Sequence, residues 1–104
     1  MKNDVLSIII HILTFSTRSF VITAGQIRAS RALLGIDQRR LAEAAGLSLP
    51  TIQRMETSEG VIRGNVDSLM KLVAALNDLG IELIADNAAS QNGGRGVRLK
   101  AAAS

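Results

Sequence analysis

Residues 38–56 read QRRLAEAAGLSLPTIQRME, and this stretch has the pattern of two short helices joined by a tight turn. Gly46 lies at the turn, because a sharp reversal favours the left-handed backbone that glycine adopts without steric cost. Ala42 is the small residue that allows the two helices to cross closely. An apolar seam between them is expected from Leu41, Ala45, Leu47, Ile52 and Met55. The stretch therefore predicts a compact pair of crossed helices.

Capping signals mark the helix starts around this stretch. Thr23 is followed three residues later by Gln26, which is the spacing of a capping box, and Ile22 can pack on Ile27 as a hydrophobic staple. The same combination of a cap and a flanking apolar pair recurs at Asp37 and at Ser48. Glycines follow the apolar segments and predict where helices stop. We expect helices at about residues 24–34, 38–45, 49–57 and 66–79.

The pattern changes after Gly80. Residues 81–84 and 97–100 alternate in part between apolar and polar side chains, as strands do. Residues 86–96 between them are rich in Asn, Ser and Gly, which is typical of a flexible loop. We favour a hairpin, and the alternative is a single strand followed by a disordered tail.

The N-terminal stretch, residues 5–15, reads VLSIIIHILTF and is the most apolar part of the chain. It is too short to span a bilayer, and its pattern fits a strand or a buried helix equally well. His11 is expected to be a core or interface residue.

We divide the chain into an apolar extension (1–21), a helical domain (22–80) and a C-terminal β-element with a tail (81–104). The extension is expected to be dispensable for binding, and the alternatives are a cover for a dimer, a start codon placed too early and a membrane anchor.

The composition limits the classes of function. The chain has 104 residues, enough for one modest core, and a formal charge of +3. Only 2% of residues are aromatic, which argues against the base-stacking surfaces of single-strand binders. There is no cysteine and one histidine, and Glu56 has no second acid, base or nucleophile at a working spacing. We therefore expect no catalytic residue, metal site or cofactor, and we assign Met55 and Met70 to core packing.

The 38–56 stretch resembles the helix-turn-helix of the lambda-repressor and Cro-like family, also called XRE-type regulators. The resemblance extends over residues 22–80. It rests on Gln38, Leu41-Ala42, Ala45-Gly46, Ser48, Thr51-Ile52 and Glu56. It implies an all-α bundle of four or five helices. Because the chain looks extended after Gly80, we expect a small C-terminal β-hairpin or strand, similar to a subset of the family that dimerises through such an element.

The resemblance also implies roles for individual residues. The helix over residues 49–56 would enter the major groove of DNA. Within it, Arg54 would bond a guanine and Gln53 an adenine, whereas Gln38 would bond a phosphate. An ion pair between Arg31 and Glu56 would hold this helix to the bundle. The full set of expected DNA contacts is Gln38, Arg39, Leu49, Pro50, Thr51, Gln53, Arg54 and Arg63.

The expected function is therefore transcriptional regulation. We expect a homodimeric repressor or autoregulator that binds double-stranded DNA. We expect it in the cytoplasm, at the nucleoid, and we expect no contact with a membrane. Residues 22–80 contain seven basic and six acidic residues, and this near balance leaves open a helix pair with a purely structural role. The main alternative is a protein-interaction module, such as the antitoxin of a toxin–antitoxin pair, in which the bundle binds DNA while the tail or the N-terminus holds the toxin.

Overall fold

The computed structural model describes residues 22–62, 64–86 and 88–101. The expected N-terminal extension, including His11, and the expected DNA contact Arg63 lie outside the described residues. The elements in chain order are α2 (Ala24–Leu34), α3 (Gln38–Ala45), α4 (Leu49–Thr57), α5 (Val66–Asp78), β1 (Ile81–Ile84) and β2 (Gly96–Leu99). The fold predicted from the sequence, a helical bundle with a small C-terminal hairpin, is confirmed.

Side-chain caps explain where the helices begin. Thr23 and Gln26 form a complete capping box at the start of α2. Asp37 caps α3 and Ser48 caps α4, each by accepting a backbone N–H from three residues ahead. Asn65 caps α5 in the same way, and the sequence analysis did not identify it. The predicted helix bounds therefore agree with the structure to within one residue, because each start is fixed by a local hydrogen bond.

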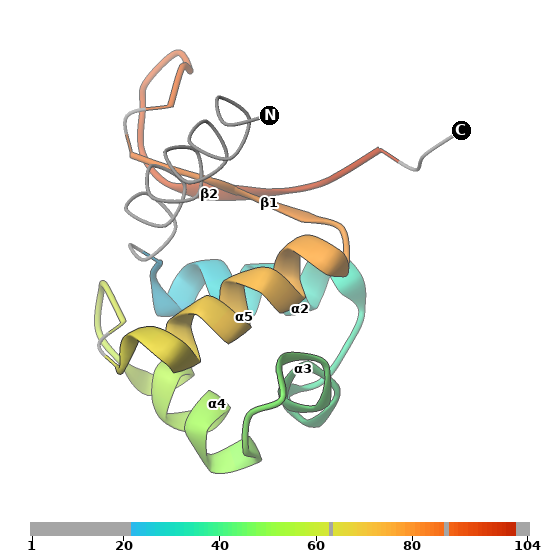
Figure 1. Ribbon diagram of the computed structural model, residues 1–104. Helices are drawn as coiled ribbons and strands as arrows, with labels where there is room; N and C mark the ends of the chain where they lie inside the picture. Colours follow the sequence, from blue (N-terminus) through green and yellow to red (C-terminus); the bar gives the residue numbers. More distant parts are fainter. Residues whose placement is uncertain (1–21, 63, 87, 102–104) are drawn as a thin grey trace, which may run out of the picture.

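The core lies between the helices and extends to the first residue of β1. Its members are Ile22, Ile27, Leu41, Ala42, Ile52, Met55, Ile62, Leu69, Leu72, Leu76 and Ile81. Figure 1 shows α2 and α5 in the middle of the molecule, with the hairpin on one side and the α3–α4 pair on the other. Met55 is in the core as expected, but the assignment of Met70 is wrong: its side chain is 47% exposed on the outer face of α5.

The C-terminal hairpin packs on the helices through one apolar face. β1 and β2 pair antiparallel, with Ile81 opposite Leu99 and Leu83 opposite Val97. The paired strands favour the hairpin over the alternative of a disordered tail. Gln26 attaches the hairpin to α2, because its side-chain amide donates to the carbonyls of Ile84 (3.2 Å) and Gly96 (2.9 Å). The capping-box glutamine therefore has a second role that its local sequence does not reveal.

The segment after α4 returns to the start of α2. The Ile62 N–H donates to the Ile22 carbonyl at 2.9 Å, and Thr23 and Val61 form an isolated antiparallel bridge. This contact joins residues before the first described helix to the loop that precedes α5. Within the described part of the chain, no helix combines the length and the apolar character needed to cross a membrane.

Candidate nucleic-acid interface

The turn between α3 and α4 is fixed by backbone hydrogen bonds at Gly46. Gly46 has φ +66°, and its N–H donates to the carbonyls of Ala42 and Glu43. The next N–H, that of Leu47, donates to the Ala42 carbonyl at 3.0 Å. This is the hydrogen-bonding pattern of a Schellman-type helix end, which requires the left-handed residue. Ala42 is buried, as expected for the small residue where α3 and α4 cross closely.

One face of α4 is not covered by any other element in the described part of the chain. Pro50, Gln53 and Arg54 are exposed, whereas Leu49 and Thr51 are half-buried. Pro50 lies in the first turn, where a missing backbone N–H costs no helical hydrogen bond. In Figure 1, α4 lies on the side of the molecule away from the hairpin. The structure thus brings five expected DNA contacts together on one accessible helix.

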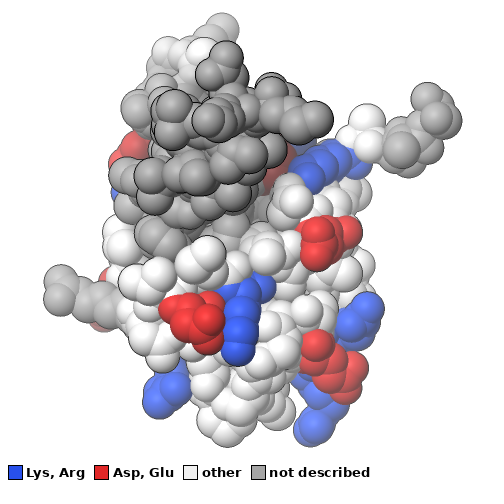
Figure 2. All heavy atoms as spheres, in the orientation of Figure 1, with Lys and Arg blue, Asp and Glu red and all other residues white. Residues whose placement is uncertain are grey.

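Two further expected contacts begin α3. Gln38 is the first residue of that helix and is half-buried, and Arg39 beside it is exposed. Backbone N–H groups in a first helical turn attract anions, because they have no partner within the helix. Figure 2 shows Lys and Arg side chains interspersed with Asp and Glu on the visible face. The basic residues visible in Figure 2 therefore do not form one continuous patch.

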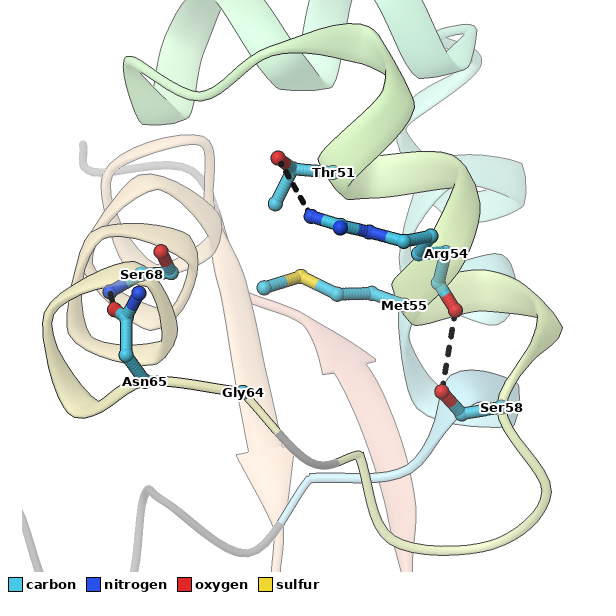
Figure 3. Close-up of a pocket in the computed structure, with 7 residues that line it drawn as sticks. All are labelled: Thr51, Arg54, Met55, Ser58, Gly64, Asn65 and Ser68. Atoms are coloured by element: carbon cyan, nitrogen blue, oxygen red, sulfur yellow. Dashed lines mark hydrogen bonds between the residues drawn. The ribbon is translucent and has the colours of Figure 1, made fainter.

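An open cavity of about 400 Å³ lies between α4 and the start of α5. Figure 3 shows Arg54 and Met55 extending from α4 toward the start of α5. The Arg54 guanidinium donates to the Thr51 hydroxyl at 3.3 Å. The cavity is lined by Thr51, Arg54, Met55, Ser58, Gly64, Asn65 and Ser68. Among the described residues, the lining combines one cation with hydroxyl and amide groups and contains no acidic side chain. Sequence reasoning did not anticipate the contributions of Ser58, Asn65 and Ser68, which come together only through the packing of α5.

Arg31 and Glu56 form a bidentate ion pair between α2 and the end of α4. Arg31 Nε lies 2.7 Å from Glu56 Oε2, and Arg31 Nη2 lies 2.7 Å from Glu56 Oε1. The Glu56 side chain is 4% exposed and that of Arg31 is 23% exposed. The hydrogen bond and the charge of Glu56 raise the pKa of Arg31, although burial opposes this. The arrangement ties the exposed helix to the bundle core.

A second arginine reaches the same residue. Arg28, one turn before Arg31 on α2, donates from Nη1 to the backbone carbonyl of Glu56. The sequence analysis did not identify this contact, because a bond from a side chain to a carbonyl leaves no residue signature at the acceptor. Among the described residues, no three His, Cys, Asp or Glu side chains gather in a way that would hold a metal ion.

Comparison with known protein families adds an independent observation. The model of a family described as helix-turn-helix matches residues 27–84, which is more than half of the chain. The match includes α3, the Gly46 turn and α4, and it continues through α5 to the end of β1. No curated protein matches the chain.

Proposed function

The chain belongs to the helix-turn-helix family of lambda-repressor and Cro-like proteins, and we propose that it binds a specific sequence of double-stranded DNA as a homodimer and regulates transcription. Membership of this family implies DNA binding. The proposal that the chain recognises a specific DNA sequence is supported by the exposed face of α4, whose orientation is set by the Gly46 turn and the Arg31–Glu56 pair. A helix in a defined orientation can place its side chains against the base edges in the major groove.

Base recognition would fall to few residues. Leu49 and Pro50 have no side-chain hydrogen-bonding groups, so they can only touch a thymine methyl or fill space. Arg54 can bond guanine O6 and N7 together, and Gln53 can do the same with adenine. Gln38, at the start of α3, is suited to a backbone phosphate. Arg39, Thr51 and Arg63 are the remaining phosphate contacts of the proposal.

We assign the dimer contact to the outer edge of β2. The Lys100 N–H donates to the Gly80 carbonyl at 2.7 Å, so in the alternating antiparallel pattern the N–H of Leu99 points away from β1. Leu99 is also 48% exposed. A two-stranded sheet is marginal alone, and pairing with the same strand of a second copy would cover its edge with two-fold symmetry. Such a dimer would repress by occupying its site.

Selection of duplexes from a random pool tests the proposal. A dimer with two recognition helices should enrich a pseudo-palindrome whose half-sites lie about 34 Å apart, roughly one turn of the duplex. A single half-site would contradict the homodimer while leaving DNA binding intact. Failure to enrich any sequence, with the folded protein verified beforehand, would refute sequence-specific recognition.

A further inference from the structure

The C-terminal end of α4 lacks a glycine cap, so its last carbonyls depend on other partners. The Arg54 carbonyl accepts from the hydroxyls of Thr57 (3.0 Å) and Ser58 (3.1 Å), which lie on the same segment. Ser58 itself follows the helix with extended backbone geometry. The Glu56 carbonyl accepts from Arg28, and this partner comes from another helix. The end of α4 is therefore completed in part by α2.

We propose that Arg28 is a positioning residue for DNA recognition, which fixes the orientation of α4 together with Arg31. This inference rests on the proposed function. The two arginines lie one turn apart on α2 and hold Glu56 at two different points, Arg28 at the backbone carbonyl and Arg31 at the carboxylate. Ile52 and Met55 pack the middle of α4 into the core, but a last turn held beyond them only through a side chain could still tilt about that contact. A second bond to the backbone restricts this tilt.

The chemistry of the contact favours such a role. A guanidinium at the C-terminal end of a helix interacts favourably with the helix dipole, and a charged donor makes a stronger hydrogen bond than a neutral one. The support for Arg28 is itself fixed, because α2 is capped at Thr23 and bonded to the hairpin through Gln26. Through Arg28, the well-anchored helix α2 therefore helps to fix the position of α4, which carries the proposed DNA contacts.

Loss of Arg28 should have a particular signature in binding. Base contacts demand a defined geometry, whereas phosphate contacts carry no sequence information and tolerate small tilts. A freer α4 should therefore weaken binding to the specific site more than binding to unrelated DNA. Because Arg28 touches no phosphate in this scheme, the dependence of affinity on salt should stay unchanged, whereas losing one phosphate contact lowers the slope by about one.

The experiment compares the full-length wild type with Arg28→Met, Arg28→Lys and a charge-matched control, Lys71→Met. Lys71 is exposed on α5, where it pairs with Asp67 of the same helix, and it has no place in the proposed DNA contacts or the proposed dimer edge. The affinity of each protein is measured for two probes, a duplex selected by the wild type from a random pool and a scrambled duplex of the same composition. The measurements are made at several salt concentrations and well below the melting temperature of each protein. For Arg28→Met we expect a loss of about threefold to tenfold on the selected duplex, the scale of one solvent-accessible hydrogen bond. Binding to the scrambled duplex should change little, Arg28→Lys should recover most of the loss, and Lys71→Met should match the wild type.

Three outcomes would overturn the assignment: unchanged specific affinity in Arg28→Met, an equal loss on both duplexes with a lower salt slope, or a loss in Arg28→Lys as large as in Arg28→Met. A DNA-free measurement separates this proposal from the function it rests on. Amide hydrogen exchange in the last turn of α4 should accelerate in Arg28→Met but not in Lys71→Met, and unchanged exchange there would also overturn the assignment. A wild type that selects no duplex would refute the proposed function alone.

Discussion

The Arg31–Glu56 pair allows a prediction about stability in which the two partners behave differently. The Glu56 carboxylate is 4% exposed, whereas the Arg31 guanidinium is 23% exposed and has a second acceptor in the Ile36 carbonyl at 3.4 Å. Removing Arg31 therefore leaves a buried carboxylate without its ionic partner. Removing Glu56 leaves a cation that still reaches solvent. Arg31→Met should destabilise the fold more than Glu56→Ala does.

Breaking a buried ion pair by removing one partner costs about 3–5 kcal/mol. We place Glu56→Ala near the lower end of this range because Arg31 remains partly hydrated, and Arg31→Met near the upper end. In a domain of this size, 1 kcal/mol lowers the melting temperature by about 4–8 °C. Glu56→Ala should therefore melt roughly 12–24 °C below the wild type, and Arg31→Met lower still.

Far-UV circular dichroism is the suitable assay, because the chain has no tryptophan or tyrosine to report unfolding by fluorescence. Glu59→Ala is the matched control, since Glu59 is an exposed glutamate close to the same helix end. The double variant Arg31→Met with Glu56→Leu should recover much of the loss, because well-packed apolar residues often replace a buried pair without penalty. Melting temperatures of both single variants close to that of Glu59→Ala would refute the reasoning, and a larger effect for Glu56→Ala would refute the asymmetry.

Three other predictions concern binding and assembly. Arg54→Ala should weaken binding to the selected duplex by about 1–3 kcal/mol of binding free energy per half-site and relax the preference at one symmetric base position. Gln38→Ala should weaken binding to selected and scrambled duplexes alike, and an equal loss on both duplexes in Arg54→Ala would reassign Arg54 to a phosphate contact. Leu99→Pro removes the N–H that points away from β1, so it should give monomers in sedimentation, and a persistent dimer would place the interface elsewhere. A chain starting at Val21 should fold and select the same site, and aggregation or lost binding would assign residues 1–20 to the core or the interface.

The sequence predicted the helices well because the residues that fix the ends of each helix lie close to those ends in the chain. Thr23, Asp37 and Ser48 each accept a hydrogen bond from three residues ahead, and Gly46 ends α3 through its own backbone conformation. Such contacts can be inferred from residue types at short spacing. The Arg31–Glu56 contact joins distant positions, and it was expected only because of the family resemblance.

Apart from the local Asn65 cap of α5, the contacts that the sequence did not predict join segments that are far apart in the chain. Arg28 donates to a carbonyl 28 positions away, and a backbone acceptor is present at every residue, so no residue type marks it. Met70 was assigned to the core from its apolar character, but its position on α5 points it outward, where it is 47% exposed. Apolar character alone does not decide burial, because much of any protein surface is apolar.

The two bonds from Gln26 to the hairpin have a consequence for the order of folding. They span 58 and 70 residues, whereas the bonds between Gln26 and Thr23 span three. Contacts at long separation form late, because closing a long loop costs chain entropy before any contact compensates it. We therefore expect the docking of β1 and β2 to complete the core after the helices begin to assemble. The proposed dimer edge would then form after the proposed DNA-reading surface, so association of two chains would be the final step of maturation.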